Sequence, residues 1–184
     1  MKRVIAIVSI LAMTILLAGC GGSSSETYSL GETVSTDTME FTLHNAQLSY
    51  YADSMCEPAE NEGAYASSKG SVLVCLDFEL KNTDRVDFDT RFFTANRFTL
   101  QQGKNTVGLV DDDKFYFGKP VYSEIKGKWE ANDAMNMLMD PDSTVHVKYV
   151  ATANFEPEDL NAPFTISVNL DSSEGSEDFT YAIE

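Results

Sequence analysis

The two histidines are the side chains best suited to proton transfer near neutral pH. His44 and His146 both fall on outward-facing positions of predicted strands and have acidic residues nearby. No GxSxG motif, the turn that carries the nucleophile of many serine hydrolases, accompanies them. The tetrapeptide Ser123-Glu124-Ile125-Lys126 matches the SxxK motif of serine penicillin-binding enzymes, but the chain lacks the companion SDN and KTG motifs. We therefore predict no catalytic residue, no cofactor and no enzymatic activity.

The amino-terminal segment has the composition of a secretory signal peptide. Lys2 and Arg3 form a positive start, and Val4–Ala18 is an almost unbroken apolar run. As a helix, this run would be about 22 Å long, which is short of a bilayer core of about 30 Å. The run therefore predicts a cleaved leader over residues 1–19 rather than a permanent membrane helix.

The leader ends in Leu17-Ala18-Gly19-Cys20, which looks like a bacterial lipobox. In lipoproteins with that motif, the cysteine sulfur receives a diacylglycerol and the chain is cut just before the cysteine. An ordinary cleavage site with a chance cysteine is the alternative. We predict lipidation at Cys20, a flexible Gly/Ser tether over residues 20–26, and attachment to the outer side of the cell membrane through the lipid.

Two further cysteines, Cys56 and Cys75, would lie outside the membrane, where disulfides persist. Cys75 falls on the outward parity of its strand, and Cys56 lies in the preceding loop, which could fold back over that strand. A bridge closing a loop of about 20 residues would contribute about 3 kcal/mol. Two unpaired thiols or an incomplete metal site are the alternatives, although the spacing matches no zinc motif. We predict a Cys56–Cys75 disulfide.

The chain is strongly acidic, with 29 Asp and Glu against 13 Lys and Arg and a net charge of −16. Such a chain repels phosphate backbones, so we predict no nucleic-acid partner. Acidic side chains cluster at Asp84/Asp87/Asp89, at Asp111-Asp112-Asp113 and at Asp140/Asp142. Loops at one end of a sandwich could bring such groups together around Ca²⁺, but none has EF-hand spacing. We interpret them as solvated surface charge and predict no metal site.

Aromatic and basic residues gather in one stretch of this acidic chain, residues 111–129. It contains Tyr116, Tyr122 and Trp129 together with four of the chain's lysines. Amphipathic aromatics beside isolated positive charge suit recognition of an acidic or glycan-bearing partner. The alternative is that this stretch contains an ordinary strand whose phenylalanines point inward. We predict that any binding function resides here, with Tyr116, Tyr122 and Trp129 as contact residues.

The rest of the chain alternates apolar and polar residues with a period of two, which is typical of half-buried strands. The alternation is clearest from Val72 to Lys81, and a change of parity within residues 39–50 predicts a bulge near Asn45. Further strands are predicted within residues 86–100, 106–110, 145–155, 164–170 and 179–183, and one helical turn within 156–160. Seven or more strands with short turns predict a single all-β domain over residues 27–184, an immunoglobulin-like antiparallel sandwich of two sheets.

Three weak motifs carry a resemblance. They are the entry Tyr28-Ser29-Leu30-Gly31-Glu32-Thr33-Val34, the strand Ser71–Lys81 running into Asn82-Thr83, and the turn Leu138-Met139-Asp140-Pro141 before a long strand. Together they resemble the immunoglobulin-like lipoprotein domains of unassigned function in Gram-positive bacteria. The resemblance implies fold and location and supplies no ligand. Relatives often have Pro-Gly at the last turn, where this chain has Pro141-Asp142.

These observations predict a surface-exposed, lipid-anchored, non-catalytic binding module of the bacterial cell envelope. Its partner would be the membrane through Cys20 and an unknown protein or glycan. Two alternatives stay open at this point. One is an envelope enzyme with a convergent site that the sequence does not display, and the other is an acidic cation-binding lipoprotein.

Overall fold

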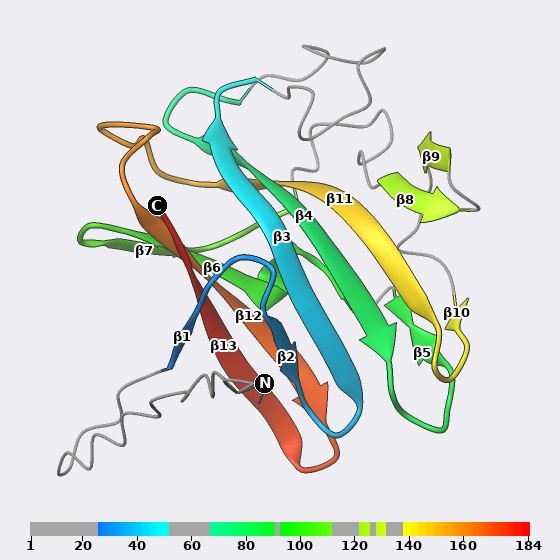
Figure 1. Cartoon of the computed structure of the whole chain (residues 1–184). Coiled ribbons are helices and arrows are strands. Elements are labelled where there is room, and N and C mark those ends of the chain that lie inside the picture. Colours follow the sequence, from blue (N-terminus) through cyan, green and yellow to red (C-terminus); the bar gives the residue numbers. More distant parts are fainter. Residues whose placement is uncertain (1–25, 52–66, 91–92, 112–121, 126–127, 132–137) are drawn as a thin grey trace, which may run out of the picture.

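The predicted all-β fold class, an immunoglobulin-like sandwich of two sheets, is confirmed. The structure, a computed structural model, describes residues 26–51, 67–90, 93–111, 122–125, 128–131 and 138–184. Two sheets face each other and enclose an apolar core, and a small two-stranded sheet lies at one end (Figure 1).

The larger sheet has six strands, and its long central strands are the ones with the clearest alternation. In spatial order they are β2 (Thr33–Ser35), β3 (Met39–Ser49), β4 (Val72–Asn82), β11 (Thr144–Ala153), β8 (Tyr122–Ile125) and β9 (Lys128–Ala131). All neighbouring pairs are antiparallel. The register of β3 against β4 shifts between Leu43 and Asn45, so the predicted bulge is confirmed.

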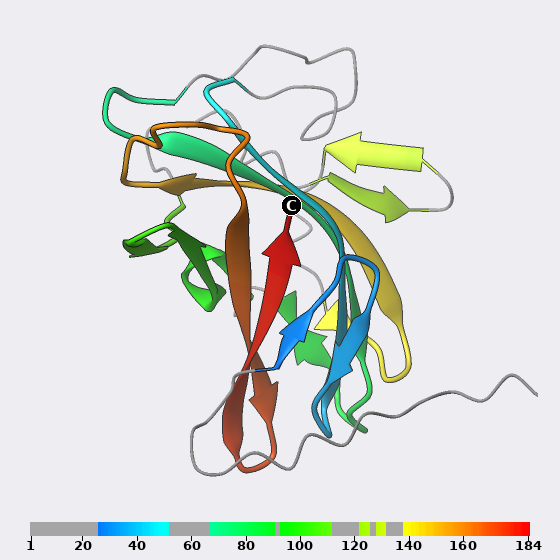
Figure 2. The same ribbon diagram turned by 60° about the vertical axis from the view of Figure 1, so that its left-hand side comes forward.

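The smaller sheet has five strands and faces the first across the core (Figure 2). In spatial order they are β1 (Thr27–Tyr28), β13 (Gly175–Ile183), β12 (Phe164–Ser172), β6 (Phe98–Gln102) and β7 (Asn105–Gly108). The β1–β13 pair is parallel, whereas the other pairs are antiparallel. A short 3-10 helix, η3 (Ala95–Arg97), precedes β6, and β5 (Phe88–Asp89) pairs with β10 (Leu138–Met139).

The core is rich in aromatic rings where the two sheets face each other. Phe41 on β3 lies 5.1 Å from Phe78 on β4 and 6.1 Å from Phe98 on β6, measured between ring centroids. Phe93 and Tyr181 also contact Phe41. Aromatic side chains bury a large apolar area each, so this cluster ties both sheets together.

Several element boundaries differ from the sequence prediction for physical reasons. β13 has nine residues, but only its last five alternate apolar and polar side chains. Its first half is exposed and polar, so the sequence pattern did not indicate a strand there. Within the predicted range 86–100, the described residues form β5 and the start of β6, with η3 between them, and residues 91–92 lie outside the described ranges. The helical turn predicted within 156–160 is absent, and bends and a turn connect β11 to β12 instead.

The turn before β11 explains how this chain manages without Pro-Gly. Asp142 adopts a φ of 60°, in the left-handed region that glycine favours. Aspartate is one of the few other residues that enters this region readily. The Asp142 N–H donates to the Asn82 carbonyl at 2.8 Å, which holds the turn against the end of β4. Asn82 is buried, and its side-chain amide donates to Met139 O at 2.9 Å.

Candidate functional site

The outward face of the six-stranded sheet collects the charged residues of its strands. One row of directly opposed residues runs from Asn45 on β3 through Asp77 on β4 and Lys148 on β11 to Tyr122 on β8 and Ala131 on β9. Residues directly opposite in antiparallel strands are the neighbours that interact in a sheet. The register therefore places Tyr122 and Ala131 of the β8–β9 hairpin in line with Asp77 and Lys148.

Both histidines lie on this face, next to acidic partners. His44 Nε2 is 3.6 Å from Glu79 Oε2, and His146 Nε2 contacts Asp77 Oδ1. The two imidazole rings are 5.3 Å apart between centroids. The prediction of outward histidines paired with acids is confirmed. Each ring is thus engaged by a carboxylate, and we assign the pair no catalytic step.

Cys75 shares this outward parity but is completely buried, as is Leu73 two residues earlier. Neither belongs to the main core, although their neighbours Val72, Val74 and Leu76 do. The outer face of the sheet is therefore covered at this end, where a plain outward parity suggested exposure. Cys56 lies outside the described residues, so its bridge to Cys75 stays a prediction.

Two of the three predicted binding residues lie in described strands, and the third does not. Tyr122 lies in β8 and Trp129 in β9, in a hairpin that forms one end of the sheet order (Figure 1). Among the described residues, the pairs Val147–Ser123 and Lys148–Tyr122 join the hairpin to β11. Tyr116 lies outside the described residues. The segment is thus in part a hairpin, where the sequence indicated a long connection.

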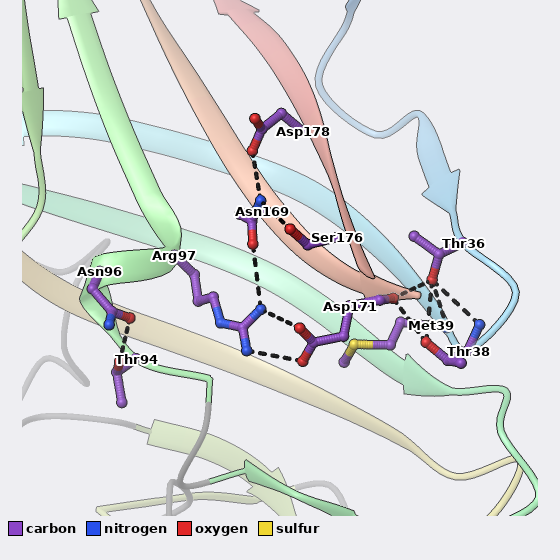
Figure 3. A network of polar contacts seen from close by, with 10 residues as sticks. All are labelled: Thr36, Thr38, Met39, Thr94, Asn96, Arg97, Asn169, Asp171, Ser176 and Asp178. Carbon is purple, nitrogen blue, oxygen red and sulfur yellow. Dashed lines mark hydrogen bonds and ion pairs between the residues drawn. The ribbon is translucent and has the colours of Figure 1, made fainter. Parts of the chain in front are cut away.

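A polar network absent from the sequence prediction links the two sheets at the opposite end of β3 from the Ala46–Ser49 segment (Figure 3). Arg97, next to β6, binds both carboxylate oxygens of Asp171 at the end of β12, at 2.6 and 2.8 Å. Thr36 and Thr38 donate their hydroxyls to the Asp171 backbone carbonyl at 2.6 and 2.8 Å. A bidentate arginine–carboxylate contact is among the stronger hydrogen-bonded pairs. This network fixes the β2–β3 turn to β12.

A second contact at this end joins the β2–β3 turn to the β12–β13 turn. The Ser173 backbone N–H donates to Asp37 Oδ1 at 2.9 Å, and the Ser173 hydroxyl donates to Asp37 Oδ2. These hydrogen bonds, with the hydroxyl contributing most, lower the pKa of Asp37. Arg97 is one of few basic residues in the chain, which is the one signal by which the sequence could have marked this region.

The tyrosine hydroxyls buried in the core serve structure. Tyr149 on β11 donates its hydroxyl to Asp111, and burial, then the Asp111 charge, raises its pKa far above the ordinary value. Tyr181 on β13 donates to the Glu32 carbonyl at 2.9 Å and to the Phe41 carbonyl at 3.2 Å. Burial raises the pKa of Tyr181 to about 12. Each tyrosine therefore stays protonated and neutral across the physiological pH range.

The acidic clusters do not assemble a metal centre in the part of the chain that the structure describes. Across those residues, no group of three or more His, Cys, Asp or Glu side chains is arranged to hold a metal ion. Asp84 and Asp87 line a depression of about 340 Å³ together with Asp37 and Asp171, but the last two are engaged by Ser173 and Arg97. Asp112 and Asp113 lie outside the described ranges.

Comparison with known proteins supports the fold and gives no activity. No family model and no curated protein matches the chain. Among solved structures, the chain is similar to an uncharacterised β-sandwich protein from Clostridium difficile 630, with a TM-score of 0.50 and 16% sequence identity. The match covers 89% of this chain and 100% of that one. At this identity, the likeness is one of fold alone.

Within the described ranges, which begin at Glu26, no helix is both long and apolar enough to cross a bilayer. Cys20 and the leader lie outside these ranges, so their roles stay predictions.

Proposed function

We propose that this chain is a lipid-anchored, non-catalytic binding module of the bacterial cell envelope, held on the outer side of the membrane through Cys20. The leader and the sequence Leu17-Ala18-Gly19-Cys20 support the anchor. The resemblance to immunoglobulin-like lipoprotein domains of Gram-positive bacteria agrees with it, and the sandwich fold is the one that such domains have. The Gly/Ser tether would leave the domain close to the membrane surface.

The observation that carries the binding role is the β8–β9 hairpin. Its strands are the last two in the order of the six-stranded sheet. They include Tyr122 and Trp129, two of the aromatic residues predicted from the sequence to bind a partner. End strands and projecting loops are where a rigid sandwich can contact a partner, since its inner faces are committed to packing. Lys148 on β11 is the register partner of Tyr122, and the outward histidines lie on β11 and β3 of the same sheet.

The test is a set of alanine variants of the full chain, scored for thermal unfolding and for a crosslinked partner recovered from intact cells. Tyr122→Ala and Trp129→Ala should keep the melting temperature and lose the partner, because truncating a central aromatic contact typically costs about 2 kcal/mol, about thirtyfold in affinity. Tyr51→Ala, at an exposed tyrosine just after the end of β3, should change neither measurement.

Two outcomes would overturn the proposal. Unfolding of Tyr122→Ala and Trp129→Ala would mean that these side chains belong to a core, and unchanged capture by all variants would make the hairpin a connector. A Cys20→Ala variant tests the lipid anchor. This variant should be lost from the membrane fraction, and its retention there with unchanged electrophoretic mobility would contradict lipidation.

A further inference from the structure

One edge of β3 is only half covered by a neighbouring strand. β2 pairs with Glu40–Thr42, and the Gly31 N–H donates to the Leu43 carbonyl at 2.8 Å. Beyond Leu43, no strand among the described residues pairs with β3 on this side. The chain instead crosses from β2 back to β1, which joins the opposite sheet (Figure 2).

The register shows which backbone groups of β3 point to this edge. The Leu43 carbonyl points to it, because it binds Gly31. Leu43 is opposite Phe78 on β4, so this pair is one of the non-hydrogen-bonded pairs of the β3–β4 ladder. Such pairs recur at every second residue along β4, and they continue past the bulge.

The next two non-hydrogen-bonded pairs are Leu76–Ala46 and Val74–Leu48. Ala46 and Leu48 therefore turn their N–H and C=O groups away from β4, toward the open edge. Asn45 Oδ1 accepts the Ala46 N–H at 2.9 Å. No hydrogen bond between described residues takes the Leu48 N–H or the two carbonyls on this side. These groups form a short template for one more strand.

A groove of about 510 Å³ runs alongside this template, which we call the edge groove. It follows Ala46–Ser49 on β3 and is closed on its other side by the end of β13 and the loop between β11 and β12. Its apolar floor consists of Ala46, Leu48, Phe164 and Ile183, which are all at most 8% exposed. An added strand would place every second side chain over this floor.

Acidic residues lie in and beside the edge groove. Glu184 lines it, and the exposed residues Glu158 and Asp159 immediately precede its lining residues Leu160–Ala162. No lysine or arginine is among the described residues that line it. The whole chain carries a net charge of −16, which disfavours a second copy of the same chain at this place.

We propose that the edge groove binds an extended basic and apolar segment of a partner protein as an additional β-strand. The segment pairs with the N–H and carbonyl of Leu48 and with the carbonyl of Ala46. Its apolar side chains contact Phe164 and Ile183, and its lysines or arginines face Glu158 and Glu184. This site lies at the opposite end of the sheet from the β8–β9 hairpin and does not depend on the function proposed there.

The probe is a capped, fluorescein-labelled heptapeptide of alternating lysine and valine, titrated into the full chain in detergent. Binding should be saturable, and alternating glutamate and valine should abolish it. Methylation of the peptide's backbone nitrogens along one edge should weaken it by about tenfold or more, because it removes the pairing donors. Amide hydrogen exchange at Leu48 should slow on binding, since this N–H gains an acceptor.

Two charge-matched double variants decide the location. Glu158→Lys with Glu184→Lys should weaken lysine–valine binding by about tenfold, whereas Glu174→Lys with Glu177→Lys, near the β12–β13 turn, should leave the affinity within about twofold. Equal losses in both variants, or an unchanged Leu48 exchange rate in the bound state, would overturn the proposal and leave nonspecific charge attraction. Trp129→Ala should bind the heptapeptide normally. A negative result for the edge groove can therefore be distinguished from a negative result for partner binding at the β8–β9 hairpin.

Discussion

The two halves of β3 share one strand and one apolar face but have different surroundings at the edge. From Met39 to Leu43, β2 covers the edge, and the Thr36 and Thr38 hydroxyls tie the adjoining turn to Asp171. From Ala46 to Ser49, the same edge opens into a groove. Inward side chains are buried in both halves, but they are at most 2% exposed from Met39 to Leu43 and 4–5% exposed at Ala46 and Leu48. The pairing of the edge, rather than the strand's own apolar pattern, therefore separates a sealed region from one that can accept a partner.

The same truncation in each half should measure this difference, and it is the largest effect that we expect. Leu43→Ala removes a fully buried side chain in the sealed half, and Leu48→Ala removes one beside the edge groove. We expect the first to lower the free energy of unfolding by about 4 kcal/mol and the second by about 2 kcal/mol, because a site open to solvent and able to relax leaves a smaller cavity. Denaturant titrations of both variants would check this, and equal losses would show that the groove is as rigid as the sealed half.

The inward face of the sheets could be predicted because burial there follows the period of the backbone. β4 alternates from Val72 to Leu80, and the parity change near Asn45 marked a bulge that the register confirms. The first half of β13 was missed because a solvent-exposed strand has no apolar alternation to detect. Its pairing with β12, residue by residue up to Gly175, comes from the turn and the ladder.

The candidate sites were harder to predict because they depend on neighbours that are distant in sequence. The parity of Cys75 was correct, but its complete burial depends on what covers the outer face. The edge groove combines β3 with Phe164 and Ile183, more than a hundred residues away. A single strand shows which of its residues face inward, but it does not show how far its neighbour extends. Consequently the histidine–acid contacts were foreseen, and the open edge was not.

The polar contacts beside the Met39–Leu43 half of β3 can be removed without a change in the apolar core. Arg97→Gln removes the two hydrogen bonds to the Asp171 carboxylate and keeps a polar, though shorter, side chain. We expect a loss of about 2 kcal/mol in the free energy of unfolding, since hydrogen bonds to a charged group contribute about 1.5–3 kcal/mol. Arg85→Gln, at an exposed arginine in the loop after β4, is the matched control and should change stability by less than about 0.5 kcal/mol.

The result for Arg97→Gln also bears on the two halves of β3. If Arg97→Gln is as stable as the control, the sealed end is held by β2 pairing and the threonine hydroxyls alone. If it also speeds amide exchange in Met39–Leu43 but not in Ala46–Ser49, the network acts on the sealed half specifically, as the contacts of Asp171 with Thr36 and Thr38 indicate.

The smallest effect concerns the boundary between the halves, where Tyr181 donates to the Glu32 and Phe41 carbonyls. Tyr181→Phe should cost about 1 kcal/mol at pH 7, the usual net contribution of such hydrogen bonds. The pKa of this hydroxyl is about 12 in the folded chain against an ordinary value of 10, so the unfolded chain releases its proton first. The contribution of the Tyr181 hydroxyl to the free energy of unfolding is therefore complete below pH 10 and is lost as the pH rises toward 12.

The comparison of wild type with Tyr181→Phe from pH 7 to pH 12 isolates this tyrosine, because both proteins retain Tyr149 and its own raised pKa. The advantage of the wild type in the free energy of unfolding should stay constant up to about pH 10 and then shrink. A constant advantage up to pH 12 would mean that the Tyr181 hydroxyl is no harder to ionise than a solvated one, and would contradict a closed junction between β1, β2 and β3. If the wild type's excess free energy of unfolding shrinks above pH 10 and the substitution leaves Leu48 amide exchange unchanged, the Tyr181 hydroxyl stabilises only the half of β3 that β2 covers. The edge from Ala46 to Ser49 is then open for a partner strand.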